Sequence, residues 1–226
     1  MSIDSALQGV SAPDQATHAH TGEWVAGVLR ARIADGQLLP GAKLSEQALS
    51  DSLSVSRNTL REAFTVLAGE AVVTRIPNRG VFVASPGPEE IREIYRVRRM
   101  IEPAVALWAT GLDLEAMGRI VGQAREAKER GDVAAMADAN QEFHQTLMRG
   151  SGSTQLQTLM RQVLAQMRLV FHAMVDAPDF HTHYVELNAA LVAKLLSGDR
   201  LGAAEQLRAY LDQAEAELLG HLAARS

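Results

Sequence analysis

Apolar side chains recur every three or four residues along most of the chain, the spacing that gathers them on one face of an α-helix. In the first third of the chain, this pattern predicts helices over residues 24–34, 45–53 and 57–67. Two short runs rich in β-branched residues follow, 72–76 and 81–83, around a Pro-Asn-Arg-Gly turn. Such runs on either side of a turn predict a β-hairpin.

The helix over residues 57–67 divides into an apolar and a polar face. Its apolar face consists of Leu60, Ala63, Phe64 and Leu67, and its polar N-terminal residues are Arg57, Asn58, Thr59 and Arg61. A turn of about three residues, 54–56, separates it from the preceding helix, which Ser45 should cap. A helix that enters the DNA major groove presents its N-terminal residues to base edges, where Arg can read guanine and Asn can read adenine. With the hairpin as a wing and Arg79 at its tip, the segment predicts a winged helix-turn-helix.

The pattern after the hairpin is helical throughout. Ser85 to Pro88 form a Pro- and Gly-rich linker, and the predicted helices beyond it are 89–110, 113–130, 132–149, 153–175, 181–197 and 200–224. We therefore predict a mainly α protein with a disordered arm (1–21), a winged helix-turn-helix domain (22–84), a linker (85–88) and an all-helical bundle (89–226). In the helix 153–175, a stripe of apolar residues favours core or dimer surface; it consists of Leu156, Leu159, Met160, Val163, Met167 and Val170.

Composition narrows the classes of protein that this chain can belong to. It has no Cys, which excludes disulfides and thiolate sites, and no apolar run of about 18 residues, so we expect a soluble cytoplasmic protein without a membrane partner. The net charge is −5, but residues 24–84 hold seven Lys and Arg against five Asp and Glu. The acidic excess therefore lies outside the predicted DNA-binding segment, where it limits non-specific binding to phosphate.

Four pieces of the first domain resemble the GntR-type bacterial transcription regulators. They are Leu39 to Glu46, Val55 to Arg57, Leu60 to Ala63 and Pro77 to Val83. The resemblance implies double-stranded operator DNA as a partner, with contacts from Ser56, Arg57, Asn58, Thr59, Arg61, Arg79 and Gly80. The chain departs from the family at Gln47, where some relatives have a phosphate-binding Arg, and at Ser54, where the turn usually has Gly.

The helical part resembles the effector-binding domain of the FadR-like subfamily. The matching pieces are Arg98 to Pro103, Asn140 to His144 and Leu195 to Asp199. Many members of the subfamily bind a divalent metal through an Asp or Asn and three His, and the metal helps to hold a small carboxylate. The matching positions here are Asn140, His144, Asn188 and Tyr210, so one imidazole of three remains.

Amides and a phenol are poor ligands for zinc or nickel, so we expect no metal or other cofactor. We predict instead a polar cavity in which Asn140, His144, Asn188 and Tyr210 hydrogen-bond a small carboxylated effector and Arg98 pairs with its carboxylate. Three alternatives stay open. The polar residues could satisfy one another in the core, Asn140 and His144 could retain a degenerate metal site, or His172, His181 and His183 could form a rearranged one.

No catalytic triad, phosphate-binding glycine loop or pair of metal-binding carboxylates stands at a recognisable spacing, so we predict no enzyme. The favoured function is a ligand-responsive transcription regulator that binds a pseudo-palindromic operator as a homodimer, with repression relieved by ligand on the family's pattern. Two alternatives are an architectural DNA-binding protein whose bundle serves only dimerisation, and a bundle with residual catalysis.

Overall fold

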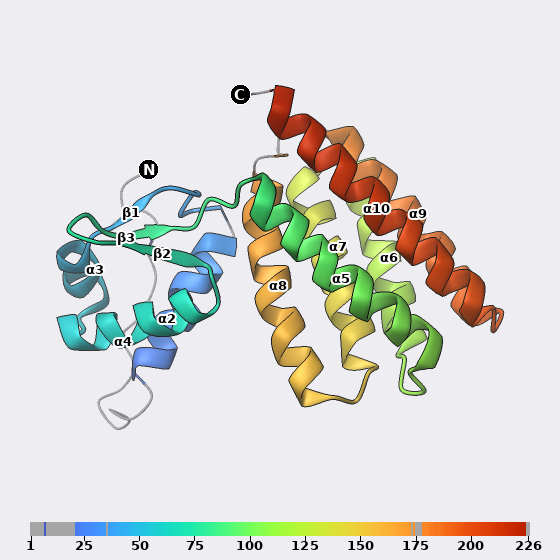
Figure 1. Cartoon of the computed structure of the whole chain (residues 1–226), viewed down its shortest axis with the longest axis horizontal. Helices are drawn as coiled ribbons and strands as arrows, with labels where there is room; N and C mark the ends of the chain where they lie inside the picture. Colours follow the sequence, from blue (N-terminus) through green and yellow to red (C-terminus); the bar gives the residue numbers. More distant parts are fainter. Residues whose placement is uncertain (1–6, 8–20, 35, 173, 175–177, 225–226) are drawn as a thin grey trace. The chain divides into compact units, whose positions relative to one another are not determined.

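The computed structural model describes residues 7, 21–34, 36–172, 174 and 178–224, and the chain divides into two compact units, residues 1–85 and 86–226 (Figure 1). The predicted disordered arm lies outside the described residues except for Leu7 and Thr21. The division falls at the predicted linker. Among the described residues, no helix is both long and apolar enough to span a membrane.

In its described residues, the N-terminal unit has three helices and a small antiparallel sheet. Its elements are α2 (Thr21–Ala34), β1 (Lys43–Leu44), α3 (Glu46–Leu53), α4 (Arg57–Gly69), β2 (Val73–Ile76) and β3 (Gly80–Val83). The strand order is β1-β3-β2, so the hairpin β2–β3 forms the wing of a winged helix-turn-helix, as predicted. The two-residue strand β1 was not predicted, because it is too short to carry a period-two pattern.

The predicted apolar face forms the core of this unit. Leu60, Ala63, Phe64 and Leu67 are all fully buried, and α4 packs against α2. The side-chain hydroxyl of Ser45 caps α3 by accepting from the backbone N–H of Ala48, and that of Ser56 caps α4 by accepting from Thr59. Ser54 ends α3 in the left-handed conformation, with φ 53° and ψ 41°. That backbone geometry explains why a Gly suits this position of the turn.

The second unit is a bundle of helices. Its elements are α5 (Pro88–Trp108), α6 (Leu114–Glu129), α7 (Val133–Arg149), α8 (Thr154–His172), α9 (Pro178–Leu196) and α10 (Arg200–Ala224). Helix α5 packs along α10, as Figure 1 shows in green and red, and α7 contacts α5, α6, α8 and α9. The bundle therefore has an interior to which α5, α7, α9 and α10 all contribute side chains.

Two predicted helix boundaries in the bundle were wrong. Helix α8 ends at His172 rather than at residue 175, and α9 begins at Pro178 rather than at residue 181. A proline suits the first turn of a helix because its fixed φ is helical and its missing N–H would have no partner there. Within α8 the predicted apolar stripe is also only partly core, since Leu159 is 41% exposed. Residues 173 and 175–177 lie outside the described part of the chain.

Candidate functional site

The N-terminus of α4 presents the predicted recognition residues at the surface. Ser56, Arg57, Asn58 and Arg61 are exposed, and Thr59 is half-buried. The hydroxyls of Ser56 and Thr59 lie 2.9 Å apart, and Ser56 also caps the helix. Ser56 therefore has a structural role in addition to any contact with a ligand, whereas Arg57, Asn58 and Arg61 extend from a helix that is already fixed.

Each of the three extended side chains has an internal partner. The guanidinium of Arg57 donates to Gln47 Oε1. The amide of Asn58 donates to Glu62 Oε1 at 2.9 Å, and Arg61 lies 3.4 Å from Glu46. These partners are exposed or half-buried, so exchanging them for phosphate or base contacts costs little.

Gln47 has a local role that its sequence position alone did not reveal. Its amide donates to both carboxylate oxygens of Asp51, at 2.9 and 2.8 Å, while its own oxygen accepts from Arg57. Because Asp51 holds the amide, Gln47 orients the Arg57 side chain.

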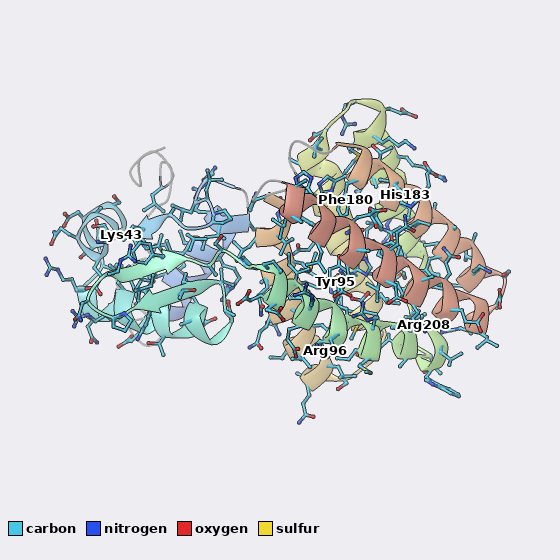
Figure 2. All side chains as sticks on the ribbon, turned by 45° about the horizontal axis from the view of Figure 1, so that its top comes forward. Lys43, Tyr95, Arg96, Phe180, His183 and Arg208 are labelled. Carbon is cyan, nitrogen blue, oxygen red and sulfur yellow. The ribbon has the colours of Figure 1, made fainter. Side chains whose placement is uncertain are left out.

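The wing carries a second basic surface. The guanidinium of Arg79 lies 5.8 Å from the ring centre of Phe82, and the ammonium of Lys43 lies 6.0 Å from it. Lys43, labelled in Figure 2, reaches this place because β1 pairs with β3 in a register that puts Lys43 opposite Phe82. Lys43 was not predicted from the sequence, since no sequence pattern indicates a strand of two residues. Gly80, with φ 109°, closes the turn beside it.

Arg75 joins the wing to the recognition helix. Its guanidinium donates to the carbonyl oxygen of Arg61 at 3.0 Å and to the hydroxyl of Thr65 at 2.7 Å. The sequence offered no signal for this contact, because it depends on how the hairpin folds back onto α4. The link therefore ties strand β2 of the wing to the recognition helix α4.

The five predicted effector-binding residues do come together inside the bundle. His144 stands at the centre, with Nε2 3.1 Å from the Tyr210 hydroxyl and Nδ1 2.7 Å from the carboxylate of Glu102. The Tyr210 hydroxyl donates to Asn140 Oδ1 at 2.9 Å, and Asn188 donates to the same oxygen at 2.8 Å. They are contributed by α5, α7, α9 and α10.

We predicted that Arg98 is available to pair with a ligand carboxylate, but its guanidinium already pairs with Glu102. The Arg98 Nε donates to Glu102 Oε1 at 2.6 Å. Both residues are buried, with 1% of Arg98 and 0% of Glu102 exposed. Glu102 was missed as a site residue, although its spacing of four residues from Arg98 on one helix would have indicated the pair. A ligand carboxylate at Arg98 would therefore have to share the guanidinium with Glu102.

The ionisation of this cluster follows from burial and charge. Burial alone would raise the pKa of Glu102, but Arg98 and His144 outweigh it and lower the pKa to about 2. Burial lowers the pKa of His144, against the opposing charge of Glu102. Burial also raises the pKa of Tyr210. The cluster at neutral pH therefore contains one ion pair, Arg98 with Glu102, surrounded by neutral polar groups.

A small cavity adjoins the cluster. It is lined by Tyr95, Arg98, Asn140, Phe171, Phe180, His181, Tyr184, Tyr210 and Ala214. Figure 2 labels two of its rings, Tyr95 on α5 and Phe180 on α9. His144 and Asn188 lie behind this wall, bonded to Tyr210 and Asn140. The volume open to the centre of a water molecule is about 10 Å³, enough for roughly one water.

The donor set at the family's metal position does not fit a divalent metal. It consists of one imidazole, two amides and a phenol, and both imidazole nitrogens of His144 already face Glu102 and Tyr210. In the described part of the chain, no group of three or more His, Cys, Asp or Glu side chains is gathered as a metal site would require. The alternative site of His172, His181 and His183 is therefore not gathered in these residues, since His181 is buried and His183 is exposed.

Comparison with known proteins identifies the family. Residues 21–83 match the model of bacterial regulatory proteins of the gntR family, and residues 93–213, more than half of the chain, match the FCD domain. The chain belongs to the GntR family, with an FCD domain. GntR-family proteins bind operator DNA, and FCD domains bind small-molecule effectors, so this GntR protein is a DNA-binding transcriptional regulator and not an enzyme.

Solved structures and curated relatives agree with that assignment. A GntR transcriptional regulator of Rhodococcus sp. RHA1 is 39% identical, with a TM-score of 0.82 over 88% of this chain and 97% of its own. McbR/YncC of E. coli is 25% identical, with a TM-score of 0.77 over 89% of this chain and 98% of its own. The gluconate operon transcriptional repressor of Bacillus subtilis is 30% identical over 145 residues, which are 62% of this chain and 59% of that protein.

Proposed function

We propose that this GntR regulator is a homodimeric repressor that binds a pseudo-palindromic operator and responds to a small carboxylated metabolite held in the bundle. The observation that carries the proposal is the pairing of an exposed basic surface on α4 and the wing with a buried polar cluster beside a cavity. The first has side chains whose solvent-accessible partners a nucleic acid can replace, and the second has the polar groups of a ligand site. Some relatives are named repressors, among them the gluconate operon transcriptional repressor, and these names support repression rather than activation of transcription.

The DNA half of the proposal rests on α4 and the wing. Arg57 and Asn58 are the residues that would read base edges, because they extend from the N-terminal turn of α4 and their internal partners are readily exchanged. Lys43 and Arg79 would contact phosphate from the wing. A monomer offers one such surface of modest charge, and pairing two of them on a two-fold symmetric operator supplies the affinity that one lacks.

The ligand half rests on Arg98, Asn140 and Tyr210, which line the cavity. Since the cavity has room for about one water, an organic acid can enter only if lining side chains move. Binding would then favour a conformation other than the one described. A ligand that prefers one conformation shifts the population towards it, and this differential affinity is the route by which it could alter DNA binding.

Two measurements test the ligand half. A thermal-shift screen of carboxylic acids should find one that raises the melting temperature, and Tyr210→Phe should weaken that acid, because the variant keeps the ring but loses the hydroxyl between His144 and Asn140. Tyr184→Phe is the comparison within the same cavity wall, since its hydroxyl donates instead to Glu217 at 3.0 Å and a smaller loss is expected there. Equal affinity of wild type and Tyr210→Phe would remove Tyr210 from the site.

We also propose that the ligand binds without a metal, since the donors do not fit one. Elemental analysis of protein purified without chelators or an affinity tag should find less than stoichiometric zinc, nickel or manganese. One equivalent of any of these would contradict the proposal. Sedimentation in the same buffer should give the mass of a dimer, and a monomer at micromolar concentration would overturn the homodimeric arrangement.

A further inference from the structure

Three buried side-chain atoms in the described residues lack a hydrogen-bond partner: Gln141 Oε1, His181 Nε2 and Asn188 Oδ1. Buried polar atoms are nearly always paired, so each such atom calls for an explanation. His181 is the one that lines the cavity, and it is 4% exposed. Asn188, also 4% exposed, stands directly behind the cavity wall through its bond to Asn140.

The ring of His181 is held firmly by its surroundings. Its centre lies 5.5 Å from that of Phe171 and 5.2 Å from that of Phe180, both in edge-to-face arrangements. A hydrogen bond with the backbone of Met174 engages the other ring nitrogen, so we assign the ring proton there and a lone pair to Nε2. Nε2 is then an unpartnered acceptor on a ring that lines the cavity.

The charge state of His181 is consistent with an acceptor. Burial, assisted by the nearby charge of Arg168, lowers the pKa of His181 to about 4. The imidazole is therefore neutral at physiological pH and does not attract a carboxylate. The cavity wall carries two different polar groups: the guanidinium of Arg98, which suits an anion, and His181, which needs a donor.

We propose that the effector is a hydroxylated acid, whose hydroxyl donates a hydrogen bond to His181 Nε2 while its carboxylate is held towards Arg98. This inference rests on the proposed function, because it names the class of acid that the same cavity would take. A water in a cavity of this size would donate to Nε2, and a ligand that displaces it without replacing that bond loses affinity. A hydroxyl replaces it, whereas a methylene does not.

The test uses pairs of acids that differ only in hydroxyl groups: lactate and propionate, malate and succinate, gluconate and hexanoate. Their dissociation constants for the full-length protein are measured by isothermal titration calorimetry. In the pair that contains a ligand, we expect the hydroxylated acid to bind about two- to tenfold more tightly, the factor that one net hydrogen bond supplies.

The variant His181→Phe tests the residue. Phenylalanine keeps the edge-to-face contacts with Phe171 and Phe180 but has no acceptor, so the preference for the hydroxylated acid should fall towards one. His181→Gln, which restores an acceptor, should recover part of the preference and also guards against a variant that folds poorly. His183→Phe is the matched control, because it makes the same change on the same helix at an exposed position (Figure 2).

Each result has a separate meaning. A preference that is lost in His181→Phe and kept in His183→Phe supports the inference. Equal binding within every pair, or a preference that survives in His181→Phe, overturns it and leaves the carboxylate site standing. Binding of neither member of any pair overturns the proposed acid-binding function and this inference with it.

Discussion

The two units of the protein use the same kinds of polar side chain in opposite ways. In the N-terminal unit, Arg57 and Arg61 stand at the surface of a fully apolar core, paired with groups that solvent can replace. In the bundle, Arg98 and Glu102 lie inside the core and depend on one another. An exposed pair contributes little to stability, whereas removing one member of a buried pair leaves a charge without compensation. Binding and folding are therefore separable in the first unit and linked in the second.

The largest expected effect comes from breaking the buried pair. Glu102→Ala leaves the guanidinium of Arg98 buried and removes the partner of His144, so the free energy of unfolding should fall by about 3–5 kcal/mol. Urea unfolding followed by circular dichroism measures it. Glu186→Ala is the control, because Glu186 pairs with Arg125 and Lys128 at the surface, and its loss should cost about 0–1 kcal/mol. Similar losses in the two variants would contradict the contrast between the units.

The next effect tests the exposed surface. Arg57→Ala should weaken binding to an operator obtained by in vitro selection by about 1–3 kcal/mol, because a base contact of Arg is worth that much. Its unfolding curve should match that of wild type, since Arg57 lies outside the core. Fluorescence anisotropy on the selected duplex measures the affinity. Arg161→Ala, at an exposed position on α8, should leave it unchanged.

A smaller effect is expected from pH, through His181. Its folded pKa of about 4 lies below the ordinary value of 6.5, so the unfolded chain binds more protons between these values. The contribution of His181 to stability is complete above pH 6.5 and is lost as the pH falls towards 4. His181→Phe should therefore lose less stability than wild type between pH 7 and 4.5, measured by urea unfolding at each pH. An identical pH dependence in both proteins would show that His181 is not buried as a neutral ring.

The smallest effect concerns the turn of the helix-turn-helix. Ser54 adopts a left-handed conformation that costs a non-glycine residue about 1–2 kcal/mol. Ser54→Gly should relieve part of this and stabilise the protein by up to about 1 kcal/mol, after the extra freedom of glycine in the unfolded chain is counted. Ser52→Gly, inside α3, should change stability in the opposite direction. Differential scanning calorimetry distinguishes the two signs.

The sequence predicted the N-terminal unit well because its signals are local. The burial of Leu60, Ala63, Phe64 and Leu67 follows from helical spacing, and the cap at Ser45 follows from residue type. Lys43 and Arg75 could not be assigned, because their positions depend on a two-residue strand and on the fold of the hairpin against α4. Local patterns do not contain such contacts.

In the bundle, too, local patterns were predicted and contacts between distant segments were not. Spacing placed Asn140 and His144 on one face of a helix, and resemblance added Arg98, Asn188 and Tyr210, which the structure brings together. The pairing of Arg98 with Glu102 and the unpartnered nitrogen of His181 depend on how helices distant in the sequence pack. The helix boundaries around residues 172–178 were wrong because a proline there was taken as part of a break rather than as a helix start.

The central claim is that a ligand in the bundle changes the affinity of the N-terminal unit for DNA. The most direct test is an anisotropy titration of the selected operator, without and with a saturating amount of the acid that most raises the melting temperature. Coupling between sites of this kind is typically about 1–3 kcal/mol, so we predict a change of roughly 5- to 150-fold in the operator dissociation constant. An operator affinity that is the same with and without the bound acid would contradict the account.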